Sequence, residues 1–315
     1  MTYLKMIMLF LQKFFYSYQI IKLVFKDMKI SYLSKNVILA VVIVIAGGCL
    51  SSTKKQATLN DPCTQNVKLT SSVELEKIGN EGKGPLEGTP YHYEIWVDEG
   101  GAQGVDLSWY GADQGGGAAF KSTWTKPDCY LGRIGYFWGD GQEYTAYKNI
   151  YVDFNFTRSG RGTAGHWSYI GIYGWSRNPE ASDPNERLIE YYIVDDWFGN
   201  QLQPDTVPLG VDITLGTIIG SITVDDETYD IHKSLRTQKP SIDGTQTFTQ
   251  IFSIRRTLRN CGTISVTEHF KKWEELGLKL GNLYEAKFLI EAGSGIGWID
   301  LSYLSFSQED QPRSE

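Results

Sequence analysis

Apolar and polar residues alternate in short runs along most of this chain, and Gly, Asp and Asn separate the runs. Clear examples are residues 91–97, 149–157, 169–175, 188–194, 228–236 and 284–291. A period of two is what a β-strand needs when one of its faces packs on a core. Many short strands with turn residues between them are typical of a β-sandwich. The pattern therefore predicts an all-β fold from about residue 90 onwards.

One segment, residues 266–276, has helical spacing instead. Val266, Phe270 and Trp273 fall on one face of a helix, and Gly277 supplies its end. We predict a single α-helix here. His269 lies on it, and we interpret this histidine as a hydrogen-bonded structural residue rather than a catalyst.

The stretch from residue 169 to residue 196 combines aromatic side chains with a carboxylate. Alternation places Tyr169, Tyr173 and Trp175 on one face of the first strand, and Glu190 and Tyr192 on one face of the second. Taken alone, a glutamate between aromatic residues is most often a solvated strand residue. The stretch by itself predicts only an aromatic platform.

Composition narrows the class of protein. The chain has 315 residues with 13% aromatic residues and 33 glycines, which suits one large β domain with its own core. Residues 1–48 contain six lysines and one aspartate, so their removal takes the formal net charge from −7 to −12. So negative a surface argues against a nucleic-acid partner.

The cysteines and histidines indicate no metal site. Beyond residue 48 the chain carries Cys49, Cys63, Cys129 and Cys261, and lipidation of Cys49 would leave an odd number. We therefore expect no disulfide framework. There is no CxxC motif and the four histidines are scattered, so we predict neither a catalytic metal nor a cofactor.

The first 48 residues predict a targeting segment. Residues 28–35 are basic, residues 37–45 are apolar, and the run ends in Ala46-Gly47-Gly48-Cys49. This ending resembles a bacterial lipoprotein signal, with Cys49 lipidated and anchored in a membrane; ordinary cleavage nearby is the alternative. Met28 competes with Met1 as the true start. Residues 49–87 are polar and predict a low-complexity tether. We expect an extracytoplasmic protein, either secreted or held at the cell surface.

Several motifs together resemble the family 11 glycoside hydrolases, which are small endo-1,4-β-xylanases. In chain order these motifs are EIWVD, YGWSRNP, LIEYYIVDD, TYDI, PSIDG, TFTQ, SIRR and EHFKKW. The resemblance implies a β-jelly roll of two twisted antiparallel sheets that form a cleft, with a single α-helix. It covers a catalytic domain at residues 88–307, followed by a polar tail at 308–315. It also implies a monomer that hydrolyses internal β-1,4-xylosidic bonds in xylan or arabinoxylan with retention.

The resemblance assigns roles to individual residues. Glu190 matches the nucleophile and Glu291 the acid/base residue, although the usual tyrosine after the latter is missing. A retaining enzyme needs these carboxyl groups about 5–5.5 Å apart. The residues matching substrate contacts are Trp96, Tyr169, Tyr173, Tyr192, Arg236, Pro240, Ser241, Ile242 and Gln250. At the position that tunes the proton affinity of the acid/base residue, the alignment leaves both Asp128 and Cys129 open.

Two rival interpretations remain at this point. A carbohydrate-binding module would explain the aromatic platform without cleaving xylan. An interaction protein that kept the jelly roll and lost activity would explain the altered Ala292-Gly293 segment after Glu291. The binding module gives no reason for glutamates at both of the family's positions, and replacing Glu190 with Gln tests the inactive interaction protein.

Overall fold

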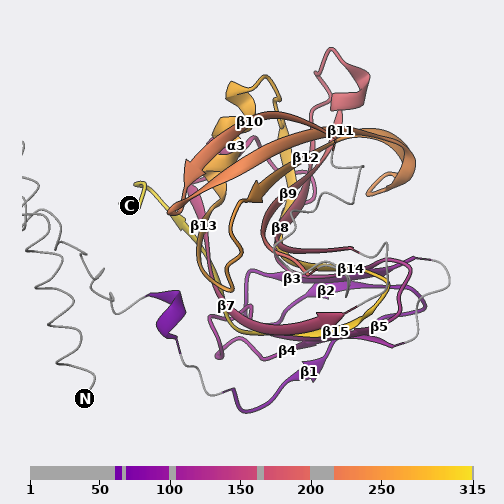
Figure 1. Cartoon of the computed structure of the whole chain (residues 1–315), viewed down its shortest axis with the longest axis vertical. Helices are drawn as coiled ribbons and strands as arrows, with labels where there is room; N and C mark the ends of the chain where they lie inside the picture. Colours follow the sequence, from indigo (N-terminus) through magenta and orange to yellow (C-terminus); the bar gives the residue numbers. More distant parts are fainter. Residues whose placement is uncertain (1–60, 66–68, 99–103, 162–166, 199–215, 314–315) are drawn as a thin grey trace, which may run out of the picture. The chain divides into compact units, whose positions relative to one another are not determined.

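The computed structural model describes residues 61–65, 69–98, 104–161, 167–198 and 216–313 (Figure 1). All of them belong to one unit of the chain, residues 58–315. The predicted signal segment, Cys49 and the start of the predicted tether lie outside the described residues. Among the residues that are described, no helix combines the length and the apolar character needed to cross a membrane.

Two β-sheets form the body of the described fold (Figure 1). The first has six strands in the order β1 (Val73–Glu74), β4 (Val105–Trp109), β5 (Phe120–Thr125), β15 (Ile296–Glu309), β7 (Asn149–Arg161) and β13 (Cys261–Ser265). The second has nine strands in the order β10 (Thr217–Val224), β11 (Glu227–Ser241), β12 (Gly244–Arg255), β9 (Leu188–Asp196), β8 (Trp167–Arg177), β14 (Asn282–Gly293), β6 (Tyr130–Phe137), β3 (His92–Val97) and β2 (Glu81–Pro85).

The all-β prediction is confirmed, and so is the alternation that led to it. On β5, the residues Phe120, Ser122 and Trp124 are buried while the residues between them are exposed. One detail differs from the expected antiparallel sheets, because β12 and β9 pair in parallel. These strands are far apart in sequence, so local alternation carries no information about their relative direction.

Both faces of the nine-stranded sheet carry clusters of packed aromatic and aliphatic side chains, and these clusters bury the central strands. Its inner face packs against the six-stranded sheet through a core that includes Phe154, Phe156 and Phe288, all 0% exposed. Its other face carries a second aromatic cluster that includes Tyr173 and Tyr192. Consequently all nine residues of β9 are buried, polar ones included.

The predicted helix is present as α3 (Val266–Glu275), with Val266, Phe270 and Trp273 fully buried. Gly277 follows it with a φ of +93°, a conformation that glycine adopts without strain. The expectation for His269 needs correction. It is buried against Tyr229, with ring centroids 4.7 Å apart, but neither ring nitrogen has a hydrogen-bond partner among the described residues. Three short 3₁₀ helices complete the described elements: η1 (Pro62–Thr64), η2 (Tyr144–Ala146) and η3 (Pro184–Glu186).

The prediction of a tether is wrong for residues 61–65 and 69–87, because these residues belong to the fold. Strand β2 pairs with β3 at the edge of the nine-stranded sheet, and Leu86 is buried in the core. Cys63 forms a disulfide with Cys261 across 198 positions, so the expectation of no disulfide is also wrong. The polar composition of β2 concealed its place in the sheet, since an edge strand needs few apolar side chains.

The predicted polar tail, residues 308–315, is ordered over most of its length. Strand β15 continues to Glu309, and Arg313 makes ion pairs with Asp153 and Glu309. The fold therefore extends beyond residue 307 at this end.

Candidate active site

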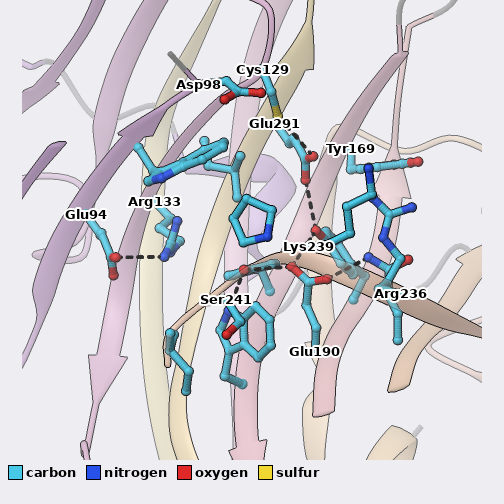
Figure 2. Close-up of a pocket in the computed structure, with 18 of the residues that line it drawn as sticks. Glu94, Asp98, Cys129, Arg133, Tyr169, Glu190, Arg236, Lys239, Ser241 and Glu291 are labelled. Carbon is cyan, nitrogen blue, oxygen red and sulfur yellow. Dashed lines mark hydrogen bonds and ion pairs between the residues drawn. The ribbon is translucent and has the colours of Figure 1, made fainter. Parts of the chain in front are cut away.

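A cleft with a volume of about 580 Å³ lies on the outer face of the nine-stranded sheet. Strands β3, β6, β8, β9, β11, β12 and β14 contribute side chains to its lining. Figure 2 shows Glu190 and Glu291 entering this space from opposite sides. A cleft of this size accommodates several sugar units or a molecule of similar bulk.

Strand register explains how two glutamates 101 positions apart in the sequence come together. On β9, Glu190 pairs with Trp175 of β8, and on β14, Glu291 pairs with Tyr169 of the same strand. Residues directly opposite each other in a sheet share a face. Strand β8 therefore places both carboxyl groups on the cleft side.

Tyr192 connects the two carboxyl groups directly. Its hydroxyl lies 3.2 Å from Glu190 Oε1 and 3.1 Å from Glu291 Oε2. The two bonded oxygens are therefore at most about 6.3 Å apart, which is just below the range of about 6.5–9.5 Å found between the carboxyl groups of inverting glycosidases.

The single hydroxyl hydrogen of Tyr192 restricts the protonation of this pair. It can be donated to only one carboxyl group at a time. If Glu291 carries a proton, it donates that proton to the Tyr192 oxygen, and Tyr192 donates its own hydrogen to Glu190. With both carboxyl groups ionised, one of the two contacts has no hydrogen. The arrangement fits one neutral and one ionised glutamate.

Glu190 is the better placed of the two to be ionised. Tyr173 donates to its Oε1 at 2.9 Å, and Gln250 donates to its Oε2 at 2.6 Å. Burial raises the pKa of Glu190, which is 7% exposed, while the donors Tyr173, Gln250 and Tyr192 and the charge of Arg236 act against that rise. The ionised form thus has three hydrogen bonds and a nearby cation to offset its burial.

The structure resolves the alternative between Asp128 and Cys129. The Sγ atom of Cys129 lies 3.7 Å from Glu291 Oε1, whereas Asp128 is exposed and does not line the cleft. Burial and the charge of Glu291 raise the pKa of the Cys129 thiol, so it stays neutral and adds no second negative charge. Asp98, which the sequence argument missed, also lines the cleft on this side (Figure 2).

The other residues implied by the resemblance gather in the same cleft. Lining it are Trp96, Tyr169, Tyr173, Tyr192, Arg236, Pro240, Ser241, Ile242 and Gln250. Residues that contact a substrate must line the cleft, and these nine do. Their contacts with a substrate stay predictions. Gln250 is further oriented by Ser234, whose hydroxyl donates to the amide oxygen at 3.3 Å.

The hairpin tip predicted from PSIDG is present and reaches across the cleft. Ser241 pairs with Gly244 at the end of β11 and β12. Asp243 at the tip accepts two hydrogen bonds from Arg177 of β8, at 3.2 and 2.7 Å. Ile242 packs against the aromatic cluster of the outer face, so the tip is held down over the cleft.

A group of four charged residues beside the aromatic platform was missed by the sequence argument. Glu94 and Arg133 line the cleft, and Glu285 and Lys287 lie behind them. Alternation alone could have found two of them, since Glu94 shares a face with Trp96 and Lys287 shares one with Glu291. None of these residues forms a metal site: within the described ranges, no cluster of three or more His, Cys, Asp and Glu side chains could hold an ion.

Comparison with known proteins gives a consistent family. The family described as "Glycosyl hydrolases family 11" matches residues 89–302, which is more than half of the chain. Endo-1,4-beta-xylanase C of Fibrobacter succinogenes is 37% identical over 284 residues, covering 84% of this chain and 42% of that protein. Endo-1,4-beta-xylanase S20 of Neocallimastix patriciarum is 38% identical over 252 residues, covering 80% and 68%.

Solved structures extend the likeness to the fold. The crystal structure of wild-type ENZbleach xylanase is 58% identical with a TM-score of 0.75, covering 81% of this chain and 94% of its own. This chain spans less than half of the Fibrobacter protein but most of the ENZbleach chain. On the family match, the curated relatives and the shared fold, the chain belongs to glycosyl hydrolase family 11.

Proposed function

We propose that this protein is an endo-1,4-β-xylanase that cleaves internal bonds of xylan by a retaining double displacement. The observation that carries the proposal is the Tyr192 hydroxyl bonded to both Glu190 and Glu291 inside a sugar-sized cleft. The oxygens that share this hydroxyl are closer than the spacing that inverting enzymes keep for a water molecule, so direct attack is favoured over inversion.

In the first step, the ionised Glu190 attacks the anomeric carbon while Glu291 gives its proton to the departing glycosidic oxygen. A covalent bond forms between Glu190 and the sugar, and the bond to the leaving chain breaks. The negative charge of Glu190 is lost in this step. Glu291 has then become the base, and the charge of Glu190 no longer opposes its ionised form.

In the second step, Glu291 takes a proton from water, and the resulting oxygen attacks the same carbon. The bond to Glu190 breaks, its carboxylate returns, and the product keeps the β configuration of the substrate. Tyr173 and Gln250 stay bonded to Glu190 and stabilise the charge that reappears on it. The neutral thiol of Cys129 contacts Glu291 without adding charge.

A non-catalytic xylan-binding module is the second candidate, and the burial of the glutamates argues against it. Glu190 is 7% and Glu291 6% exposed, and both are held by a dedicated hydrogen-bond network. Burying carboxyl groups is unfavourable, and stacking on sugars does not need them.

Reducing-sugar release from unsubstituted xylan separates the two candidates. We expect the wild type to release xylo-oligosaccharides, and Glu190→Gln and Glu291→Gln to lose this activity. Glu87→Gln is a matched control, because Glu87 is exposed and lies outside the cleft. Release that survives Glu190→Gln, or a wild type that binds xylan and releases nothing, refutes the proposal.

We further propose that the protein acts as a monomer outside the cytoplasm, anchored through a lipid on Cys49. The disulfide between Cys63 and Cys261 supports an oxidising compartment. Mass spectrometry of the mature N-terminus tests the anchor, with ordinary cleavage as the contrary result, and size-exclusion chromatography tests the monomer.

A further inference from the structure

Four charged residues sit beside the glutamates on the outer face of the nine-stranded sheet; Arg133, Glu285 and Lys287 are buried and Glu94 is partly exposed. Arg133 Nη2 lies 2.9 Å from Glu94 Oε1, and Arg133 Nε lies 3.5 Å from Glu285 Oε1. Lys287 Nζ lies 3.0 Å from Glu94 Oε2 and 2.5 Å from Glu285 Oε2. Figure 2 shows the pair of Glu94 and Arg133 at the edge of the cleft.

Removing these charges from water carries a large desolvation cost. Arg133 is 3%, Lys287 1% and Glu285 0% exposed. Although burial favours its neutral form, the charges of Arg133 and Lys287 lower the pKa of Glu94 to about 2, so Glu94 is ionised. Well-packed apolar residues often stabilise a fold at least as well as such a network. Stability alone gives little reason for it.

The carboxylate partners of Arg133 do not accept hydrogen bonds from all of its N–H groups. Its Nε and Nη1 atoms are buried and have no hydrogen-bond partner among the residues that the structure describes. The guanidinium lies instead over the ring of Tyr173, with its central carbon 4.8 Å from the ring centroid. Because a cation is attracted to the face of an aromatic ring, this contact gives Arg133 a partner that no hydrogen bond supplies.

Tyr173 has one hydrogen to donate, and the structure fixes where it goes. The indole nitrogen of Trp175 lies 2.5 Å from the Tyr173 hydroxyl. An indole N–H can only donate, so the Tyr173 oxygen accepts this bond. Its own hydrogen is then left for Glu190 Oε1 at 2.9 Å. The position and polarity of the Tyr173 ring therefore act directly on Glu190.

We propose that Arg133, held in place by Glu94, is a positioning residue for Glu190 that acts through Tyr173. The guanidinium fixes the ring and draws electron density from the phenol, which makes the hydroxyl a stronger donor to the ionised carboxylate. Burial and the charge of Glu190 raise the pKa of Tyr173, and the charge of Arg133 opposes that rise. This inference rests on the proposed role of Glu190 as nucleophile.

Other groups act on Glu190 as well, and one of them, Tyr192, also interacts electrostatically with Arg133. They are Tyr192 on β9, Arg236 on β11, Gln250 on β12, Cys129 just before β6 and, through Tyr192, Glu291 on β14. A change at Arg133 should leave their contacts in place, because none of them bonds to it.

The test is a pair of charge-neutral double variants. Arg133→Met with Glu94→Gln removes the cation over Tyr173 together with its counter-ion. Lys287→Met with Glu285→Gln also removes one positive and one negative charge from the group and leaves Arg133 with Glu94. For the first variant we expect kcat/KM on xylo-oligosaccharides to fall about tenfold, the size of a buried cation–π contact. Its acidic limb in the pH profile should move to higher pH. The second variant should move that limb much less.

Tyr173→Phe provides the decisive background, since it keeps the ring and removes the hydroxyl. In this background, Arg133→Met with Glu94→Gln should not move the acidic limb further. The inference is overturned if Arg133→Met with Glu94→Gln has the same acidic limb as the wild type. It is also overturned if this variant shifts the acidic limb equally far in the Tyr173→Phe background. A purely structural role would lower the melting temperature and leave the limb in place. Failure of the proposed function is distinct, since the wild type would then be inactive or Glu190→Gln active.

Discussion

Replacing Tyr192 by Phe removes the hydroxyl that joins the two glutamates and changes little else. The ring stacks on Phe252, with centroids 4.4 Å apart, and a phenylalanine keeps that contact. The variant removes a donor from Glu190 and an acceptor from the protonated Glu291. The ionised form of the first and the neutral form of the second each lose support. We therefore expect the bell-shaped pH profile of kcat/KM to narrow from both sides.

The size of the effect follows from the bonds lost. Hydrogen bonds to charged groups contribute about 1.5–3 kcal/mol. Both contacts here are on the long side, at 3.2 and 3.1 Å, which favours the lower half of that range. A loss of about 1.5–2 kcal/mol in the transition state corresponds to a fall of about 10- to 30-fold in kcat/KM at the optimum.

The assay is kcat/KM on xylo-oligosaccharides as a function of pH, with Tyr191→Phe as the matched control. Tyr191 is the neighbouring residue on β9, but its side chain faces the core and its hydroxyl donates to the backbone carbonyl of Glu285. The control should keep the width of the wild-type profile. If Tyr192→Phe keeps that width as well, or widens the profile, the shared-hydroxyl account is wrong.

Three further predictions follow from the same residues. Cys129→Asp should move the pH optimum of xylan hydrolysis downwards, because a neutral aspartic acid can donate a hydrogen bond to Glu291 as it ionises in the first step, and this donor is lost as pH rises and the aspartic acid ionises; an unchanged or higher optimum would contradict this. Glu190→Gln should gain stability relative to the wild type as pH rises above the ordinary glutamate pKa of 4.5. Because the pKa of Glu190 is raised in the folded protein, its neutral form stabilises the fold below that pH, and this contribution is lost as the carboxylate ionises. Melting temperatures from pH 4 to pH 8 measure it, and a constant difference would argue against a raised pKa. Cys261→Ser should lower the free energy of unfolding by about 2–5 kcal/mol, because the disulfide to Cys63 closes a loop of 198 positions. Urea titration measures this change, and an unchanged midpoint and slope would show that the disulfide does not stabilise the fold.

The strands and the site were predictable to different degrees from the sequence. Alternation located most strands because one face of each packs on a core. It also placed Glu190 and Tyr192 on one face. It could not bring Glu291 to them, since pairing between distant strands leaves no local trace. That step came from the family resemblance.

The errors have physical causes as well. An odd cysteine count hid the bond between Cys63 and Cys261, because parity does not say which thiol stays free. Strand β2 is polar and glycine-containing, so its place at a sheet edge looked like a linker. The network around Arg133 was missed because each charge, read alone, looks like a surface residue.

The anomeric configuration of the first product is the most direct test of the two-glutamate geometry. Proton NMR during hydrolysis of an unsubstituted xylo-oligosaccharide shows which anomer appears before mutarotation. Carboxyl groups joined by one tyrosine hydroxyl predict the β-anomer first. Initial release of the α-anomer would contradict this mechanism.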